Sequence, residues 1–252
     1  MPNWTDPPAF TFSHRLDNGH TATHDVYRRG EGPPILILQE LPGIGVETYD
    51  LADRLIAAGF SVYLPHLFGR LGRANKLTTA TNFLRLYCVR REFQIFWNGK
   101  QSPIAAWMRA LCADISARED GARLGVIGMC LTGSFVIPLM AEDAVQAAVA
   151  SQPALPIKST PPLHMSQEDI DAAKEKMMEK GPALAMRYKS DDLSKPAHIC
   201  ALKTAFGEHL DIKEYDNPDG VTGRQHSLLT LDYLPEAYDL TETYFKTRFG
   251  MA

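Results

Sequence analysis

The chain has 252 residues, of which 45% are hydrophobic and 22% are charged, and its formal net charge is −4. This composition is typical of a soluble globular protein, and the lack of a basic stripe interleaved with aromatic residues argues against nucleic-acid binding. No apolar run approaches the ~20 residues that span a bilayer, and the N-terminus lacks the basic and apolar segments of a signal peptide. We therefore expect a cytoplasmic protein without a membrane segment, folded as one domain over residues 1–252.

The first predicted elements are a β-hairpin, a strand, a helix and a second strand. The hairpin spans about residues 10–30, because Asn18-Gly19 lies between two extended stretches and favours a tight turn. PPILILQE is a short, continuously apolar run, which is typical of a strand covered on both faces. VETYDLADRLIAAG has the apolar spacing of a helix that ends at Gly59, and FSVYLP reads as the next strand.

The strand and helix alternation resumes after residue 120. Strands are predicted in ARLGVIG, AVQAAVAS, PALAMRY and LDIKEYD, and helices in LTGSFVIPLMAE, KPAHICALKTAFG and LPEAYDLTETYFKTRF. Such alternation indicates an α/β protein with a mainly parallel sheet and helices on both faces.

Two segments interrupt this alternation and are candidates for binding-site walls. Residues 77–102 are rich in aromatic and arginine side chains, which predicts a partly helical cap segment; whether it moves as a lid is left open. Residues 155–181 form an insert with a proline-rich loop, followed by a helix with Ser166 as its N-cap and Asp169 in its first turn.

The four cysteines do not form a metal-binding or redox pattern. They are widely spaced, without a CxxC pair, which argues against zinc, a thioredoxin-like couple and a disulfide framework; they are Cys88, Cys112, Cys130 and Cys200. Free thiols are expected, and three of the four are expected to be small buried side chains.

Cys130 is the cysteine with a candidate chemical role. In VIGMCLTGSF it follows an apolar strand, with Gly128 two residues before it and Gly133 three residues after it. Small flanking residues are needed where a sharp strand–helix turn lifts a nucleophile above a sheet, although Thr132 is larger than such a turn usually takes. A thiol there would lie at a helix N-terminus, which favours the thiolate. The alternative interpretation is a small packed side chain.

An acid and a base follow Cys130 in the order that an α/β nucleophile site requires. Asp191 and Asp192 come just after the strand in PALAMRY, and His226 lies in the loop after the last predicted strand. Carboxyl ends of parallel strands share one edge of a sheet, so these groups are expected to meet there. Among the eight histidines, His226 is the one whose position fits a catalytic base.

On these residues the sequence resembles the dienelactone hydrolase family of α/β-hydrolases, from about Ile35 to the C-terminus. The matching segments are ILILQELPGIG, YLPHLFGR, GVIGMCLTG, YKSDDL and RQHSLLT. The resemblance implies an α/β-hydrolase fold with a Cys-His-Asp triad at Cys130, His226 and Asp191, with Asp192 left open as the acid.

The resemblance also implies roles for residues around the triad. Glu40 would hydrogen-bond the resting cysteine and give way when substrate enters, and the N–H groups of Leu131 and Leu41 would form the oxyanion hole. The implied reaction is attack of a thiolate on an ester or lactone carbonyl, followed by hydrolysis of the thioester, as in a carboxymethylenebutenolidase. It needs neither a metal nor an organic cofactor.

The substrate is where the sequence departs from the family. Family members that open a carboxylated lactone hold its carboxylate with two arginines, one of them four residues after the histidine, where this chain has Thr230. Arginines that could substitute, as tentative substrate-binding residues, are Arg85, Arg90, Arg91 and Arg224. A small ester or lactone is therefore expected as the substrate, without commitment to one dienelactone.

Two alternative functions remain at this point. The same triad could serve a carboxylesterase or thioesterase of neutral substrates. Alternatively, a non-catalytic relative could bind a ligand or sense oxidants through Cys130, although a sensor would need neither the acid nor the base. The oligomeric state is left open between a monomer and a small homo-oligomer.

Overall fold

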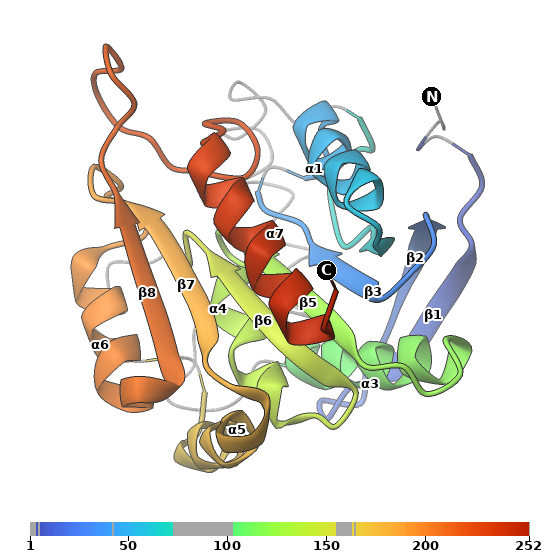
Figure 1. The fold of residues 1–252 in the computed structure, drawn as a ribbon. Coiled ribbons are helices and arrows are strands. Elements are labelled where there is room, and N and C mark those ends of the chain that lie inside the picture. Colours follow the sequence, from blue (N-terminus) through green and yellow to red (C-terminus); the bar gives the residue numbers. More distant parts are fainter. Residues whose placement is uncertain are drawn as a thin grey trace.

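The computed structural model describes residues 4, 6–41, 43–72, 103–154, 163 and 165–251. Within these residues one sheet of eight strands has the order β1-β2-β4-β3-β5-β6-β7-β8 (Figure 1). The strands are β1 (Phe10–Arg15), β2 (Thr21–Arg29), β3 (Pro34–Leu38), β4 (Ser61–Pro65), β5 (Leu124–Met129), β6 (Val145–Ser151), β7 (Ala183–Tyr188) and β8 (Leu210–Tyr215). The described helices are α1 (Val46–Ala57), α3 (Pro103–Arg118), α4 (Gly133–Val136), α5 (Gln167–Lys180), α6 (Pro196–Phe206) and α7 (Pro235–Phe249).

The strands from β4 to β8 along the sheet all pair in parallel, and β1 and β2 form an antiparallel edge. A parallel sheet is normally buried on both faces by helices. In agreement with this, every residue of β3, β4, β5 and β7 is buried. The parallel arrangement brings the carboxyl ends of β3, β5, β6, β7 and β8 to one edge of the sheet.

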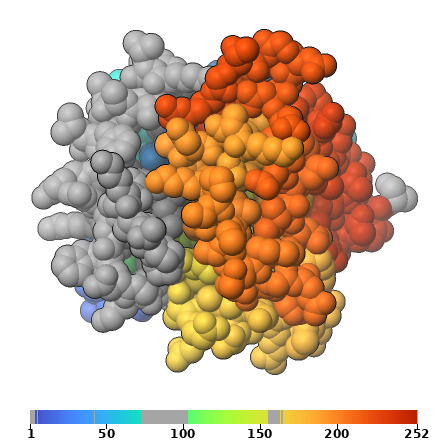
Figure 2. Space-filling model, turned by 90° about the vertical axis from the view of Figure 1, so that its left-hand side faces the viewer, coloured from blue at the N-terminus to red at the C-terminus, as the bar shows by residue number. Residues whose placement is uncertain are grey.

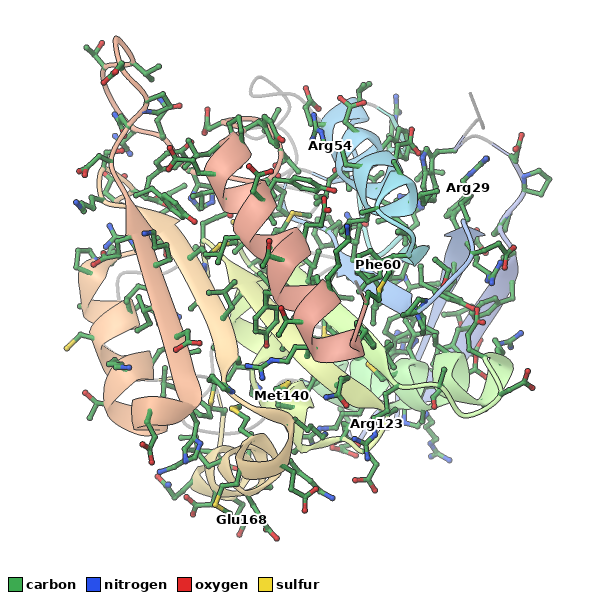
Figure 3. All side chains as sticks on the ribbon, viewed as in Figure 1. Arg29, Arg54, Phe60, Arg123, Met140 and Glu168 are labelled. Carbon is green, nitrogen blue, oxygen red and sulfur yellow. The ribbon has the colours of Figure 1, made fainter. Side chains whose placement is uncertain are left out.

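Helices cover both faces of the sheet, which confirms the predicted α/β class. One core lies between the sheet and α3, α4, α5 and α6, and the other lies between the sheet and α1 and α7. In the second core Phe60, labelled in Figure 3, packs edge-on against Phe245 and Phe249 of α7. Seen from the β8 side, residues of α6 and β8 form the middle of the surface, with α5 below (Figure 2).

Two of the predicted helices can be compared with the structure in detail. Ser166 caps α5 as predicted, since its Oγ accepts from the Asp169 N–H while the Asp169 carboxylate accepts from the Ser166 N–H. The helix predicted in LTGSFVIPLMAE is instead the short α4 and a separate 3₁₀ turn (Pro138–Ala141). Pro138 explains this break, because proline has no N–H for the hydrogen bond that continues an α-helix and its ring crowds the carbonyl one turn before it.

Helix α3 was not predicted, although its buried residues recur at helical spacing. Its outer face carries alanines such as Ala113 and Ala117, which weakens the polar contrast on which an amphipathic pattern depends. None of the helices in the described ranges combines the length and apolar character needed to cross a membrane. The predicted cap segment, residues 77–102, lies outside the described residues, as does most of the loop that begins the insert.

Candidate active site

Cys130 directly follows β5 and has a left-handed backbone conformation, with φ of 54°. Its N–H donates to the Ser151 carbonyl at 3.1 Å, and its own carbonyl accepts from Gly133 and Ala154 at 3.1 and 3.0 Å. A residue with a Cβ pays about 1–2 kcal/mol for this conformation, so the surrounding bonds must hold it. The half-buried thiol is thereby lifted from the end of a central strand.

The two glycines of the turn are required by close approach of other groups. A Cβ on Gly128 would lie 2.4 Å from Cγ1 of Val136 and 2.7 Å from the Thr132 carbonyl oxygen, and one on Gly133 would lie 3.0 Å from the Ser151 oxygen. Real Cβ atoms essentially never come as close to backbone as at Gly128, and the approach at Gly133 is tighter than most, which agrees with the prediction that small residues flank the cysteine.

Thr132, the unexpectedly large residue of the turn, is fully buried and joins the turn to the end of β3. Its Oγ1 accepts from the Met129 N–H at 2.9 Å and donates toward the Leu38 and Gln39 carbonyls at 2.9 and 3.2 Å. The hydroxyl therefore satisfies buried backbone groups of two neighbouring strands.

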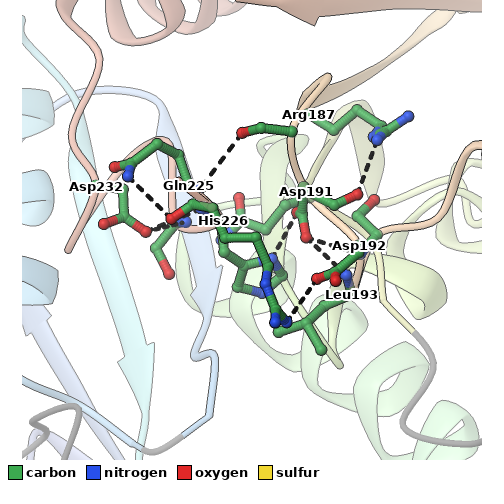
Figure 4. A network of polar contacts seen from close by, with 12 residues as sticks. Arg187, Asp191, Asp192, Leu193, Gln225, His226 and Asp232 are labelled. Carbon is green, nitrogen blue, oxygen red and sulfur yellow. Dashed lines mark hydrogen bonds and ion pairs between the residues drawn. The ribbon is translucent and has the colours of Figure 1, made fainter. Parts of the chain in front are cut away.

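His226 and Asp191 lie together beyond the ends of β8 and β7. Nδ1 of His226 is 2.6 Å from Oδ2 of Asp191, and this contact is among those drawn in Figure 4. The Asp191 side chain is 1% exposed, and its Oδ1 accepts from the N–H groups of Leu193 and Ser194 at 2.9 and 3.1 Å. These bonds fix the carboxylate and aim its second oxygen at the imidazole.

Asp192, the alternative acid, points elsewhere. It forms an ion pair with Arg224 at 2.8 Å, and both side chains are mostly exposed. The geometry thus brings Asp191, and not Asp192, to His226. Among the tentative substrate-binding arginines, Arg224 is engaged in this surface pair, and the other three lie outside the described residues, namely Arg85, Arg90 and Arg91.

Two residues that the sequence analysis did not identify position this pair. Asp232 accepts from the N–H groups of His226 and Ser227 at 2.9 and 3.2 Å, so it shapes the histidine loop. Arg187, 1% exposed within β7, donates to the Asp191 carbonyl at 2.8 Å. A charged residue inside the otherwise apolar run ALAMRY was the available signal for Arg187, because a buried charge needs a partner.

The surroundings of His226 favour its charged form. Burial alone lowers the pKa of the imidazole, but the hydrogen bond to Asp191 and the interaction with the Cys130 sulfur outweigh it and raise the pKa to about 11. Nε2 is buried and makes no well-aligned hydrogen bond within the described part of the chain. The sulfur is nevertheless near enough to attract a proton on the ring, as a nucleophile next to its base would be.

Glu40, two residues after β3, is buried and accepts three hydrogen bonds. Thr230 Oγ1 donates to its Oε1, and Ser227 Oγ and Gln152 Nε2 donate to its Oε2 at 2.7 and 3.1 Å. Burial raises the pKa of the carboxyl, although these donors and the nearby His226 oppose the shift. Cys130 is not among the partners of Glu40, so the implied bond between the two is not formed here.

Gln152 was missed by the sequence analysis although it carries the same signal as Glu40. It is a polar residue directly after a buried apolar strand, here β6, and it is fully buried. The N–H groups of Leu41 and Leu131, by contrast, were expected as oxyanion donors. Neither donates a backbone hydrogen bond within the described residues.

The other described cysteines differ from Cys130 in burial. Cys112 is fully buried in α3 and burial raises the pKa of its thiol. Cys200 is exposed on α6, contrary to the expectation of a buried side chain, and Cys88 lies outside the described residues. Within the described ranges, no cluster of three His, Cys, Asp or Glu side chains is placed to hold a metal ion.

Solved structures of similar fold cover nearly all of this chain. A Klebsiella pneumoniae protein proposed to be a dienelactone hydrolase has a TM-score of 0.60 and 17% identity, with 96% of this chain and 99% of that one covered. A dienelactone hydrolase-like promiscuous phosphotriesterase from metagenomic libraries has a TM-score of 0.59 and 14% identity, with 95% and 98% covered. A Paleococcus ferrophilus monoacylglycerol lipase has a TM-score of 0.56 and 15% identity, with 89% and 99% covered. At these identities the likeness shows an α/β-hydrolase fold.

The family follows from the sequence itself. No curated protein sequence gives a significant match to this chain. The model of the dienelactone hydrolase family, however, matches residues 21–217, which is most of the chain and includes the cysteine turn. With that match, the chain belongs to the dienelactone hydrolase family of ester hydrolases with an α/β-hydrolase fold.

Proposed function

We propose that the chain hydrolyses small carboxylic esters or lactones through Cys130, His226 and Asp191. The observation that carries this proposal is the left-handed Cys130 at the end of β5, beside a half-buried histidine whose Nδ1 is 2.6 Å from a fixed carboxylate. A nucleophile, a base and a group that orients the base are the parts that covalent acyl transfer requires.

The reaction has two steps on these groups. In the first, Sγ of Cys130 bonds to the carbonyl carbon, the bond to the leaving oxygen breaks, and that oxygen takes a proton from Nε2 of His226. In the second, His226 accepts a proton from water, whose oxygen displaces the sulfur and releases the acid. The N–H groups of Leu131 and Leu41 would bind the oxyanion in both steps.

Neutral esters are the favoured substrate class within this proposal. Thr230 occupies the position of a family arginine that holds an anionic substrate, and its hydroxyl is bonded to Glu40. The likeness to a phosphotriesterase and a lipase, whose names imply uncharged esters, agrees with this preference.

Turnover of p-nitrophenyl acetate and of a cis-dienelactone by the wild type and by Cys130→Ala tests the proposal. We expect the wild type to hydrolyse the neutral ester faster, and Cys130→Ala to lose about 10⁴-fold or more in kcat/KM. Cys200→Ala is the matched control, because Cys200 is an exposed thiol on α6, and it should keep full activity.

Each part of the proposal has its own contradicting result. Full activity of Cys130→Ala on both substrates would show that Cys130 is a packed thiol and that the hydrolytic mechanism lies elsewhere. Preferential opening of the anionic lactone by the wild type would instead retain the triad and contradict the neutral substrate class.

A further inference from the structure

We propose that Glu40 is held in a fixed buried clamp by Gln152, Ser227 and Thr230, which leaves Cys130 paired with His226 as thiolate and imidazolium before any substrate binds. This inference rests on the proposed catalytic role of Cys130. It differs from the arrangement implied by the family resemblance, in which the glutamate holds the resting thiol and releases it when substrate enters.

Three hydrogen-bond donors hold the Glu40 carboxylate. Two come from the histidine loop and one from the end of β6, and together they use both carboxylate oxygens. Hydrogen bonds to a charged acceptor are stronger than neutral ones, and moving the carboxylate would leave these buried donors unsatisfied. The clamp therefore opposes a swing of Glu40 toward Cys130.

Gln152 is held rigidly by its backbone and by its neighbours. Its φ is 34°, a conformation that residues with a Cβ rarely adopt, and its N–H donates to the Met186 carbonyl at 2.6 Å. Ser151 Oγ donates to its Oε1, which turns the Nε2 donor toward Glu40. A strained backbone, together with a fully buried side chain whose amide bonds both Ser151 and Glu40, is the pattern of a functional positioning residue.

Several titratable groups face the His226 imidazole. Asp191 faces His226 from the loop after β7, Cys130 from the turn after β5, and Glu40 from the end of β3. Asp232 contacts the backbone of the histidine loop, and the exposed pair of Arg224 and Asp192 lies at the surface.

The carboxylates nearest the ring, those of Asp191 and Glu40, favour a proton on it. In the resting pair the Cys130 proton moves from Sγ to Nε2 of His226, and no other bond changes.

The pH dependence of Cys130 alkylation by iodoacetamide, without substrate, tests the inference. The thiolate displaces iodide, and a preformed pair predicts a nearly constant rate between about pH 6 and pH 8, whereas an ordinary cysteine with a pKa of about 8.5 reacts about tenfold faster per pH unit. Mass spectrometry of the Cys130 peptide measures the rate, and the exposed Cys200 in the same sample gives the ordinary profile.

Gln152→Met tests the clamp, because it keeps the length of the side chain and removes the amide donor. We expect the alkylation rate at pH 7 to fall at least about threefold and to become pH-dependent, since a loosened Glu40 can accept a bond from the thiol and stabilise its neutral form. Gln146→Met is the matched control, because Gln146 lies at the other end of β6, bonded to Arg123. It should leave the profile unchanged.

The outcomes separate this inference from the proposed function. If Cys130→Ala keeps its hydrolytic activity, the proposed function fails. If Cys130 carries the hydrolysis but the wild-type thiol reacts as an ordinary cysteine, only the resting pair is overturned. An unchanged profile in folded Gln152→Met, checked by circular dichroism, overturns the clamp, and Thr230→Val repeats the test if that variant does not fold.

Discussion

The hydroxyl of Thr132 links two strand ends through a single atom. Thr132→Val keeps the shape of the side chain but leaves the Met129 N–H and the Leu38 carbonyl without their buried partner. We expect a loss of about 1–3 kcal/mol in the free energy of unfolding, which is the usual cost of unsatisfied buried groups. Urea denaturation measures it.

Thr247→Val provides the comparison at the residue scale, because Thr247 is exposed on α7 and bonds the carbonyl one turn before it. This substitution should change the free energy of unfolding by no more than about 0.5 kcal/mol. Equal losses in the two variants would mean that the hydroxyl of Thr132 does not join the strands.

At the scale of elements, the turn between β5 and α4 depends on the absence of a Cβ at Gly128. Gly128→Ala forces Cβ against Val136 and the Thr132 carbonyl. We expect a loss of about 1–3 kcal/mol in stability from overpacking and about 10²-fold in kcat, because a displaced turn misplaces the thiol. Denaturation and ester turnover measure the two effects.

Gly121→Ala is the control for this turn. Gly121 has φ of +82° with open space around it, and it lies between α3 and β5, before the strand rather than after it. The Gly121→Ala variant should lose about 1–2 kcal/mol in the free energy of unfolding, from backbone strain alone, and its kcat should be unchanged. A similar loss of kcat in both variants would indicate general destabilisation instead of a displaced nucleophile.

The strands and the order of the chemical groups were predictable from sequence because both depend on local pattern. Continuous apolar runs identified β3 and β5, and the position of Cys130 after β5 followed directly. The partners of Glu40 were not predictable, since Gln152 and Thr230 reach it only through the tertiary arrangement of three separate loops. The prediction of one continuous helix over LTGSFVIPLMAE was wrong because Pro138 interrupts the apolar pattern.

For the molecule as a whole, His226 makes stability depend on pH. Its pKa is raised to about 11 in the folded protein, against about 6.5 when unfolded. In the resting pair this proton comes from Cys130, so the folded and unfolded states bind equal numbers of protons between about pH 6.5 and pH 8.5, the ordinary pKa values of the two groups. Above about pH 8.5 the unfolded cysteine also releases its proton while the folded imidazole keeps its own, and the stabilising contribution is lost as the pH rises toward about 11.

The stability difference between the wild type and His226→Asn should therefore stay nearly constant from about pH 6.5 to 8 and shrink from about pH 8.5 to 10, by up to about 1.4 kcal/mol per pH unit. Urea denaturation of both proteins at each pH measures this difference. A difference that already shrinks between about pH 6.5 and 8 would contradict the transfer of the Cys130 proton to the folded imidazole.

The contact between Glu40 and Thr230 joins positions 190 residues apart in the chain, and its consequence concerns the timing of synthesis. A ribosome that has made residues up to the turn after β5 has produced the nucleophile, but neither the acid nor the base. The thiol of such a nascent chain has no imidazole to take its proton, so it remains an ordinary, weakly reactive cysteine. Its activation therefore waits until nearly the whole chain has been made and folded.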